Sequence, residues 1–202
     1  MIPAFKGVRS GNSTPFPGNL CVSNNDETMH TIPFSKEPFK SGDIVKVDFG
    51  IIYNNIYTDH CKTIAIGNIT EEEQRLIDST KLCIDEGVKR AILGNTTGDI
   101  SNTLQTISEV SGFKFVRGGY SGHGIGKTLW DYPNVPYYGK KGSGKKLEKG
   151  MVLCVEIQLT MGSDELFTDS DGWTIKTVDG SKSAMFEQMV MVDDEPLILT
   201  NW

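Results

Sequence analysis

Three acidic residues in this 202-residue chain lie within apolar segments, and their carboxylates are of the type that binds metal ions. Asp48, Glu156 and Glu187 each interrupt an apolar run: VKVDFGII, MVLCVEIQL and AMFEQMVMV. Such runs are typical of buried strands, and a buried carboxylate without a partner is energetically costly. Three acids in three buried strands would repel one another unless a cation neutralised them. The alternative interpretation is that each acid is an ordinary salt-bridge partner.

A hairpin places a fourth carboxylate beside the first. Two β-rich runs flank Asn54-Asn55 within residues 42–67, and asparagine tolerates the positive φ of a two-residue turn. With this turn, Asp48 lies opposite Cys61. Asp59 stands two residues before Cys61, so it is a diagonal neighbour of Asp48 on the same face, at roughly 7–8 Å.

The fifth candidate is His123, which lies between two glycines in the segment GHGIG. Flanking glycines indicate a backbone packed so closely that no larger side chain fits, and a histidine held there is usually used for its imidazole. The four carboxylates and this histidine form a ligand set for two divalent metal ions, which typically lie about 3.5–4 Å apart. Oxygen ligands with one imidazole suit Mn, Fe(II), Co or Zn.

The elements that position these residues are predicted from periodicity and capping. The first 30 residues lack periodicity and are rich in Gly, Pro, Ser and Asn, so we expect an ordered loop. Thr70 and Glu73 form a capping box that opens a helix. We predict helices at about 71–92 and 99–111, and later strands at 113–118, 151–159, 173–178 and 184–192. This pattern favours an α+β fold with a mixed, mostly antiparallel sheet in a single domain, residues 1–202.

Composition excludes several classes of function. The net charge of -6 argues against a nucleic-acid partner, since such proteins usually have a basic face. The four cysteines match no zinc motif, and no signal peptide favours their pairing as disulfides. No apolar run approaches the roughly 20 residues that span a bilayer, so we expect no membrane contact and a cytoplasmic location.

The candidate segments together resemble the type I methionine aminopeptidases of the creatinase/aminopeptidase superfamily, which have the pita-bread fold. The resemblance runs from Ala4 to Thr200. It rests on five metal-ligand segments in the same order: VDFG, YTDHCKTI, GHGIG, GMVLCVE and SAMFEQMVMV. DGWTIKT at 171–177 matches a sixth segment, whose tryptophan borders the methionine pocket.

The resemblance implies a role for each ligand. Asp48 would chelate one metal, Asp59 and Glu187 would bridge both, and His123 and Glu156 would hold the other. Glu156 would also carry a proton to the leaving amine. His30 would orient the substrate and stabilise the tetrahedral intermediate. The implied pocket-lining residues are Phe16, Cys21, Leu129 and Trp173.

The chain departs from the family pattern at two site positions. Trp130 in GKTLWDYP stands where the family normally has a histidine that contacts the scissile peptide, and Ile157 follows Glu156 where proline is usual. An indole donates one hydrogen bond but takes no proton. The resemblance therefore predicts reduced activity.

The chain also begins at the family's substrate-binding loop, without the roughly two helices that normally precede it. With these first-half helices missing, the outer face of the hairpin would be uncovered, and its outward residues Val47, Phe49, Ile51 and His60 are mostly apolar. We therefore expect self-association or a helper subunit over this part of the sheet.

Two classes of function follow. The first is a dimetal aminopeptidase that removes the initiator methionine from nascent polypeptides, with the ribosome as the candidate place of action. The second is a weakened or inactive relative that binds peptides or a protein partner. All five ligands are present, which favours the enzyme. An X-Pro peptidase would carry an added N-terminal domain, and a type II methionine aminopeptidase a helical insertion.

Overall fold

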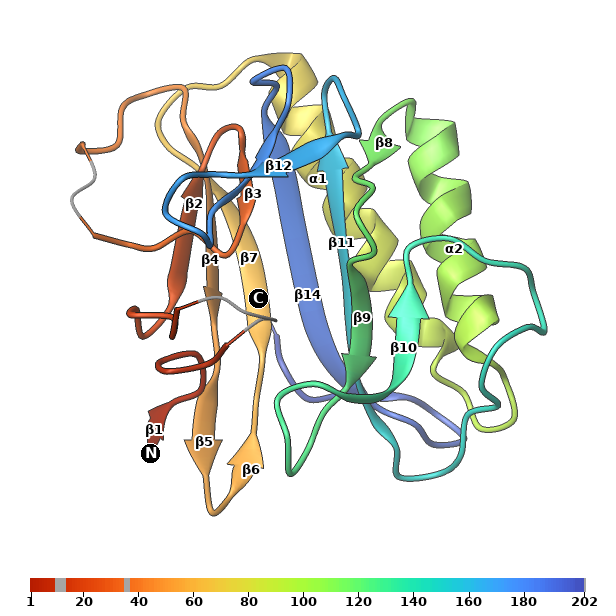
Figure 1. Ribbon diagram of the computed structural model, residues 1–202. Coiled ribbons are helices and arrows are strands. Elements are labelled where there is room, and N and C mark those ends of the chain that lie inside the picture. The colour runs from red at the N-terminus through yellow and green to blue at the C-terminus, as the bar shows by residue number, and fades with distance from the viewer. Residues whose placement is uncertain (10–13, 35–36, 202) are drawn as a thin grey trace.

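A curved antiparallel sheet forms the centre of the molecule (Figure 1). The structure is a computed structural model that describes residues 1–9, 14–34 and 37–201. Within these ranges the central sheet has nine strands. Across the sheet they are β10 (Asp131–Pro136), β9 (Ser121–Gly124), β11 (Val152–Thr160), β14 (Ser183–Met191), β7 (His60–Ala65), β4 (Ile44–Phe49) and β2 (Cys21–Asn24). Two short strands complete it, with β8 (Lys114–Phe115) beside β11 and β15 (Leu197–Ile198) beside β14.

Two smaller sheets flank the central one. The first joins β1 (Ile2–Pro3), β5 (Ile51–Tyr53) and β6 (Ile56–Tyr57), and the second joins β12 (Leu166–Thr168), β13 (Ile175–Thr177) and β3 (Glu27–Met29). Every pairing between these described strands is antiparallel, and the parallel bridge in this part of the chain is isolated, between Ile92 and Asp193. The predicted α+β class with a mostly antiparallel sheet is confirmed.

Both α-helices cover one face of the second half of the sheet. α1 (Glu71–Gly87) contacts β14 and β11, and α2 (Thr97–Ser111) contacts α1 and β10. Figure 1 shows α1 behind β14 and β11, and α2 at the right side of the view. The capping box is confirmed, because Thr70 accepts a hydrogen bond from the backbone N–H of Glu73 at 3.2 Å and the Glu73 carboxylate accepts one from the Thr70 N–H at 2.7 Å. Neither helix has the length and apolarity for crossing a bilayer.

The first helix ends earlier than predicted. α1 stops at Gly87 and continues only as a short 3-10 turn, η1 (Val88–Arg90). A β-carbon at Gly87 would lie 2.8 Å from the Leu104 side chain, so glycine allows the two helices to pack closely at this end. Ile92, which was expected in the helix, instead forms the bridge to Asp193.

The Asn54-Asn55 turn and its register are confirmed. Both asparagines have positive φ, 49° and 61°, as a type I′ turn requires. Asp48 pairs with Cys61 as expected. The hairpin, however, is not one continuous ladder. A β-carbon at Gly50 would clash with the backbone oxygen of Thr58, and beyond this close approach the tip pairs with β1 in the separate sheet.

The expectation of a loop over the first 30 residues was wrong in part. Residues 10–13 lie outside the described ranges, but β1, β2 and β3 all fall in this segment. β2 forms four ladder pairs with β4, including Cys21 with Asp48. A non-local ladder therefore makes these residues strands despite their weak local pattern.

A buried lysine fixes the strand that carries Asp48. Lys46, on the same face of β4, is 1% exposed. Its ammonium group donates to the backbone oxygens of Asn25 at 2.7 Å and Ser183 at 3.1 Å. It thus connects β4 to the turn after β2 and to the start of β14, which holds the first-half strands against the second half.

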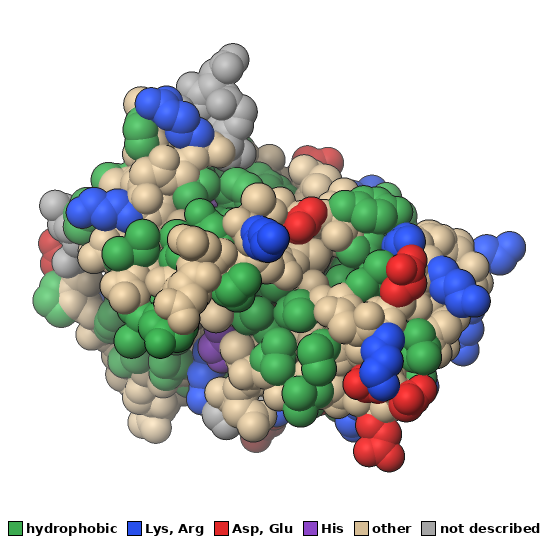
Figure 2. All heavy atoms as spheres, turned by 90° about the horizontal axis from the view of Figure 1, so that it is seen from below, with side chains coloured by type: hydrophobic (Ala, Val, Ile, Leu, Met, Phe, Trp, Pro, Cys, Tyr) green, Lys and Arg blue, Asp and Glu red, His purple; other side chains and the backbone are tan. Residues whose placement is uncertain are grey.

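The outer face of the first half of the sheet shows apolar side chains. Phe49 is 48% exposed and Ile64 on β7 is 43% exposed, whereas Val47 and His60 are half-buried. Ile51 belongs to the smaller sheet, so it does not extend this face. Viewed from below, hydrophobic side chains also cover much of the end of the molecule, and charged side chains gather toward one side (Figure 2).

Candidate metal centre

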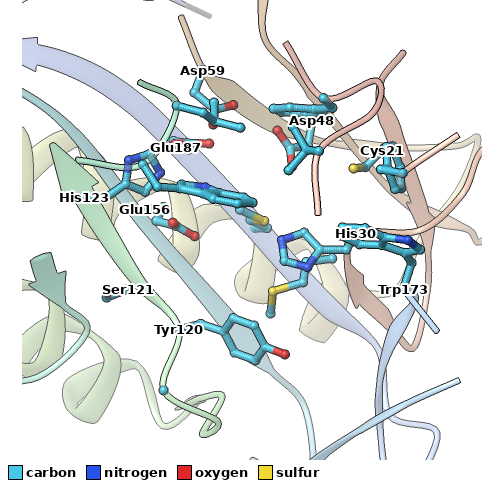
Figure 3. Close-up of a pocket in the computed structure, with 18 of the residues that line it drawn as sticks. Cys21, His30, Asp48, Asp59, Tyr120, Ser121, His123, Glu156, Trp173 and Glu187 are labelled. Carbon is cyan, nitrogen blue, oxygen red and sulfur yellow. The ribbon is translucent and has the colours of Figure 1, made fainter. Parts of the chain in front are cut away.

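The sheet register brings the five predicted ligands to one face. Glu156 pairs with Glu187 across β11 and β14, and Asp48 and Glu187 both pair with Cys61 of β7. His123 pairs with Cys154, two residues before Glu156. Because residues two apart on a strand share a face, these side chains all point to the side opposite the helices. Figure 3 shows them converging at one end of a cavity.

Three of the predicted ligands form the tightest group. Potential ligand atoms of Asp59, His123 and Glu187, together with the sulfur of Cys154, all lie within 4.8 Å of one another. Asp48 and Glu156 lie outside that group but line the same cavity. Each of the five predicted ligands exposes at most 9% of its surface.

Burial raises the pKa values of the four carboxyl groups. Removal from water raises the pKa of Asp48 to about 7 and that of Glu156 to about 8. The pKa values of Asp59 and Glu187 are raised well above their usual range, first by burial and then by the charges of neighbouring carboxylates. The four acids therefore cannot all be ionised together without positive charge between them.

The donor atoms fit divalent metal ions. Within the described ranges, Asp48 Oδ1 and Glu187 Oε1 are buried oxygens without a hydrogen-bond partner, so their lone pairs remain available to a cation. His123 Nδ1 lies 2.8 Å from the backbone oxygen of Gly124, which leaves Nε2 to bind a metal. Burial also lowers the pKa of His123, which favours the neutral imidazole that metals require.

Close packing around His123 explains its flanking glycines. A β-carbon at Gly122 would clash with the backbone oxygen of Cys154, and one at Gly124 would meet the backbone of Tyr132. β9 therefore packs so closely between β11 and β10 that only glycine fits at the two positions next to His123. The imidazole is consequently held in a fixed position over the face of the sheet.

The cavity extends from the acids to an apolar end. Its volume is about 330 Å³. The six residues predicted to contact substrate all line it: Phe16, Cys21, His30, Leu129, Trp130 and Trp173. Figure 3 shows His30, Cys21 and Trp173 at the end away from His123. Trp130 is the most exposed of the six at 48%, so it forms part of the rim.

Aromatic packing holds His30 in place at that end. Its ring meets Tyr120 and Trp173 edge-on, with centroids 6.0 and 6.3 Å apart. Trp173 is itself fixed by its indole N–H, which donates to the backbone oxygen of Thr14 at 2.8 Å. Burial lowers the pKa of His30 to about 4, so at neutral pH the uncharged ring can donate one hydrogen bond and accept another.

The sequence interpretation missed three residues beside the ligands. Cys154 belongs to the tight group, and Gln158 and Tyr137 donate hydrogen bonds to Glu156. Cys154 and Gln158 stand two residues either side of Glu156, so strand alternation would have placed them on its face. Tyr137 lies just beyond β10, and no local signal links it to Glu156.

The chain matches a known peptidase family over nearly its whole length. Residues 4–194 match metallopeptidase family M24. The chain is 42% identical over 200 residues to a methionine aminopeptidase of Clostridium acetobutylicum, covering 98% of this chain and 78% of that protein. It is 38% identical to one of Aquifex aeolicus, again covering 98% of this chain and 78% of the relative.

Solved structures confirm the pita-bread fold. The methionine aminopeptidase of Thermotoga maritima superposes with a TM-score of 0.93 at 36% identity, covering all of this chain and 79% of that chain. A prolidase of Thermococcus sibiricus superposes with a TM-score of 0.72 over 91% of this chain and 45% of that one. At 21% identity this second likeness shows the fold alone.

The raised pKa values predict how stability depends on pH without metal. The unfolded chain releases the Asp48 and Glu156 protons near pH 4, whereas the folded protein holds them up to pKa values of about 7 and 8. Between those limits the folded state binds more protons, so the free energy of unfolding falls as pH rises. Metal ions neutralise the ionised acids, so the stabilisation by Mn²⁺ should grow over the same range.

Thermal unfolding between about pH 5 and pH 8, with Mn²⁺ and with a chelator, measures this effect. We expect the difference in Tm between the two conditions to widen steadily with pH. A difference that stays constant or narrows would contradict the account.

Proposed function

The chain belongs to metallopeptidase family M24, and from that premise we propose that it is a dimetal aminopeptidase that removes the N-terminal methionine from proteins and peptides. One observation carries the proposal: a single cavity joins five buried ligands for divalent metals to an apolar end beside His30. In this proposal a terminal residue of modest size would occupy the cavity of about 330 Å³, with its side chain at the apolar end and its peptide bond near the acids. The names of the relatives support methionine as that residue.

Each ligand has a proposed role. Asp48 would hold one metal ion, His123 and Glu156 would hold the other, and Asp59 and Glu187 would contribute to both. The bound ions, of Mn, Fe(II), Co or Zn, would supply Lewis acidity toward the peptide carbonyl and lower the pKa of water. The Cys154 sulfur lies in the same tight group, within 4.8 Å of the potential ligand atoms of Asp59, His123 and Glu187.

The protein's own side chains handle protons and position the substrate. Glu156 accepts a proton from the attacking water on its carboxylate and passes it to the leaving amine. His30, neutral and held by two aromatic rings, donates a hydrogen bond toward the substrate carbonyl and stabilises negative charge that develops there. Phe16 and Trp173 pack edge-on at 5.1 Å and form the wall against the methionine side chain.

We propose that the natural substrates are nascent polypeptides in the cytoplasm, as they leave the ribosome. We also propose that a second copy or a helper subunit covers the outer face of the first half of the sheet. The exposed Phe49 and Ile64 support this covering. Light scattering at high protein concentration should show an associated species, and a monodisperse monomer would contradict self-association.

Peptide hydrolysis tests the proposed activity. Purified protein should cleave Met-Ala-Ser faster than Leu-Ala-Ser or Ala-Ala-Ser in the presence of Mn, Co, Fe(II) or Zn. Discrimination by shape is worth about 1–3 kcal/mol per methylene, so we expect preferences of about 10–200-fold in kcat/KM. Glu187→Gln should abolish cleavage, whereas Asp194→Asn, at an exposed acid, should not. Equal kcat/KM for the three peptides would rule out a methionine pocket.

Trp130 limits the rate in this proposal. An indole on the rim takes no proton, and positioned acid–base or hydrogen-bonding groups typically contribute about 10²–10⁴-fold. Trp130→His should therefore raise kcat on Met-Ala peptides more than it lowers KM. Trp130→Phe, which reduces bulk without adding a hydrogen-bonding ring, is the matched control and should not raise kcat.

An unchanged or lower kcat in Trp130→His, with metal content intact, would show that Trp130 is only a wall of the cavity. If neither form cleaves any peptide while both bind metal, the chain is better described as a peptide- or protein-binding module.

A further inference from the structure

Glu156 accepts hydrogen bonds from two side chains, and in this it differs from Asp48 and Glu187. Its Oε2 accepts a hydrogen bond from the Tyr137 hydroxyl at 3.0 Å and another from Gln158 Nε2 at 3.3 Å. In contrast, Asp48 Oδ1 and Glu187 Oε1 have no hydrogen-bond partner within the described part of the chain. Because both donors reach the same oxygen, the lone pairs of Glu156 Oε1 remain available to the cavity.

Two donors on one oxygen restrict a torsion that is otherwise soft. The terminal torsion of a glutamate side chain has broad minima, so an unsupported carboxylate rotates readily. A metal ligand that rotates must be ordered when the ion binds, and outer hydrogen-bond partners remove that cost. Fixing Oε2 therefore defines which oxygen of Glu156 faces the metal ions.

Tyr137 is held by the core and by its connection to α2. Its side chain is 2% exposed and packs in the main core. Two residues further on, the backbone of Gly139 bonds to α2 at both of its polar groups, accepting from Asn102 Nδ2 and donating to Gln105 Oε1, each at 3.2 Å. The hydroxyl is thus presented to Glu156 by a segment that is tied to a helix.

The burial of Gln158 lowers the stability of the folded protein. It is completely buried, and its Nε2 also contacts Met185 Sδ at 3.2 Å. Its own Oε1 is buried without a partner, which destabilises the folded state. An apolar residue would pack there without that loss, so core stability alone does not account for a glutamine.

We propose that Tyr137 and Gln158 are positioning residues that fix the Glu156 carboxylate for metal binding and proton transfer. The inference rests on the proposed function, because it needs Glu156 to be a metal ligand. Neither residue touches the substrate or the reacting atoms. Both act through Glu156 by holding Oε2 and directing Oε1 to the cavity.

Metal binding by the metal-free protein tests the proposal without relying on activity. Calorimetric titration with Mn²⁺ and Co²⁺ compares wild type, Tyr137→Phe and Gln158→Leu. Loss of an outer hydrogen bond to a ligand typically costs about 10–100-fold in metal affinity, so we expect each variant to weaken at least one binding step on that scale. Tyr138→Phe is the matched control, since this neighbouring tyrosine is 62% exposed and stacks on Phe115.

Thermal unfolding of the same metal-free proteins separates positioning from packing. Gln158→Leu removes a buried unsatisfied oxygen, so its Tm should equal or exceed that of wild type while its metal affinity falls. A purely structural role predicts the reverse: a lower Tm with unchanged affinity. If Tyr137→Phe fails to fold, Gln158→Leu alone still decides the question.

The outcomes distinguish this inference from the proposed function. Wild type that binds two ions, with both variants binding them at wild-type affinity, would overturn the positioning roles alone. Wild type that binds no divalent ion would overturn the proposed function, and the positioning roles with it. The visible absorption spectrum of the Co²⁺-loaded proteins should also change in the two variants and not in Tyr138→Phe.

Discussion

Four carboxylates share one buried cavity, and their mutual repulsion is the constraint on which the rest of this structure depends. Burial disfavours ionisation of all four acids, and neighbouring carboxylates add to this effect for Asp59, Glu156 and Glu187, so the folded protein needs protons or cations among them. Surface salt bridges elsewhere contribute little to stability by comparison. A fold that keeps such a cluster must hold it rigidly enough for a bound ion to offset the repulsion.

The sheet supplies that rigidity through register. Asp48, Glu156 and Glu187 come from different strands, and a shift of one residue in any ladder would turn its acid to the helix side. The Asn54-Asn55 turn fixes the register of β4 with β7, and the Lys46 ammonium ties β4 to β14. The glycines beside His123 permit β9 to approach closely enough for the imidazole to reach the acids.

Local chemistry made much of this predictable from the sequence. Acids within apolar runs, an asparagine turn and glycine-flanked histidine each carry their signal in a few neighbouring residues. The missed features depend on contacts between distant parts of the chain. β2 is a strand because β4 lies beside it, the hairpin divides at Gly50 because Thr58 approaches it, and Tyr137 reaches Glu156 across the sheet. The position of Cys154 beside Glu156, in contrast, could have been predicted from the alternation of side chains along a strand.

Anomalous diffraction from crystals grown with Mn²⁺ tests the central claim most directly, because it locates the cations among the acids. The account predicts two peaks in the cavity, roughly 3.5–4 Å apart, with Asp59 and Glu187 between them. Asp48 should lie beside one peak, and His123 with Glu156 beside the other. A cavity without anomalous density, with peaks only at surface acids, would contradict the claim that divalent ions hold these four carboxylates together.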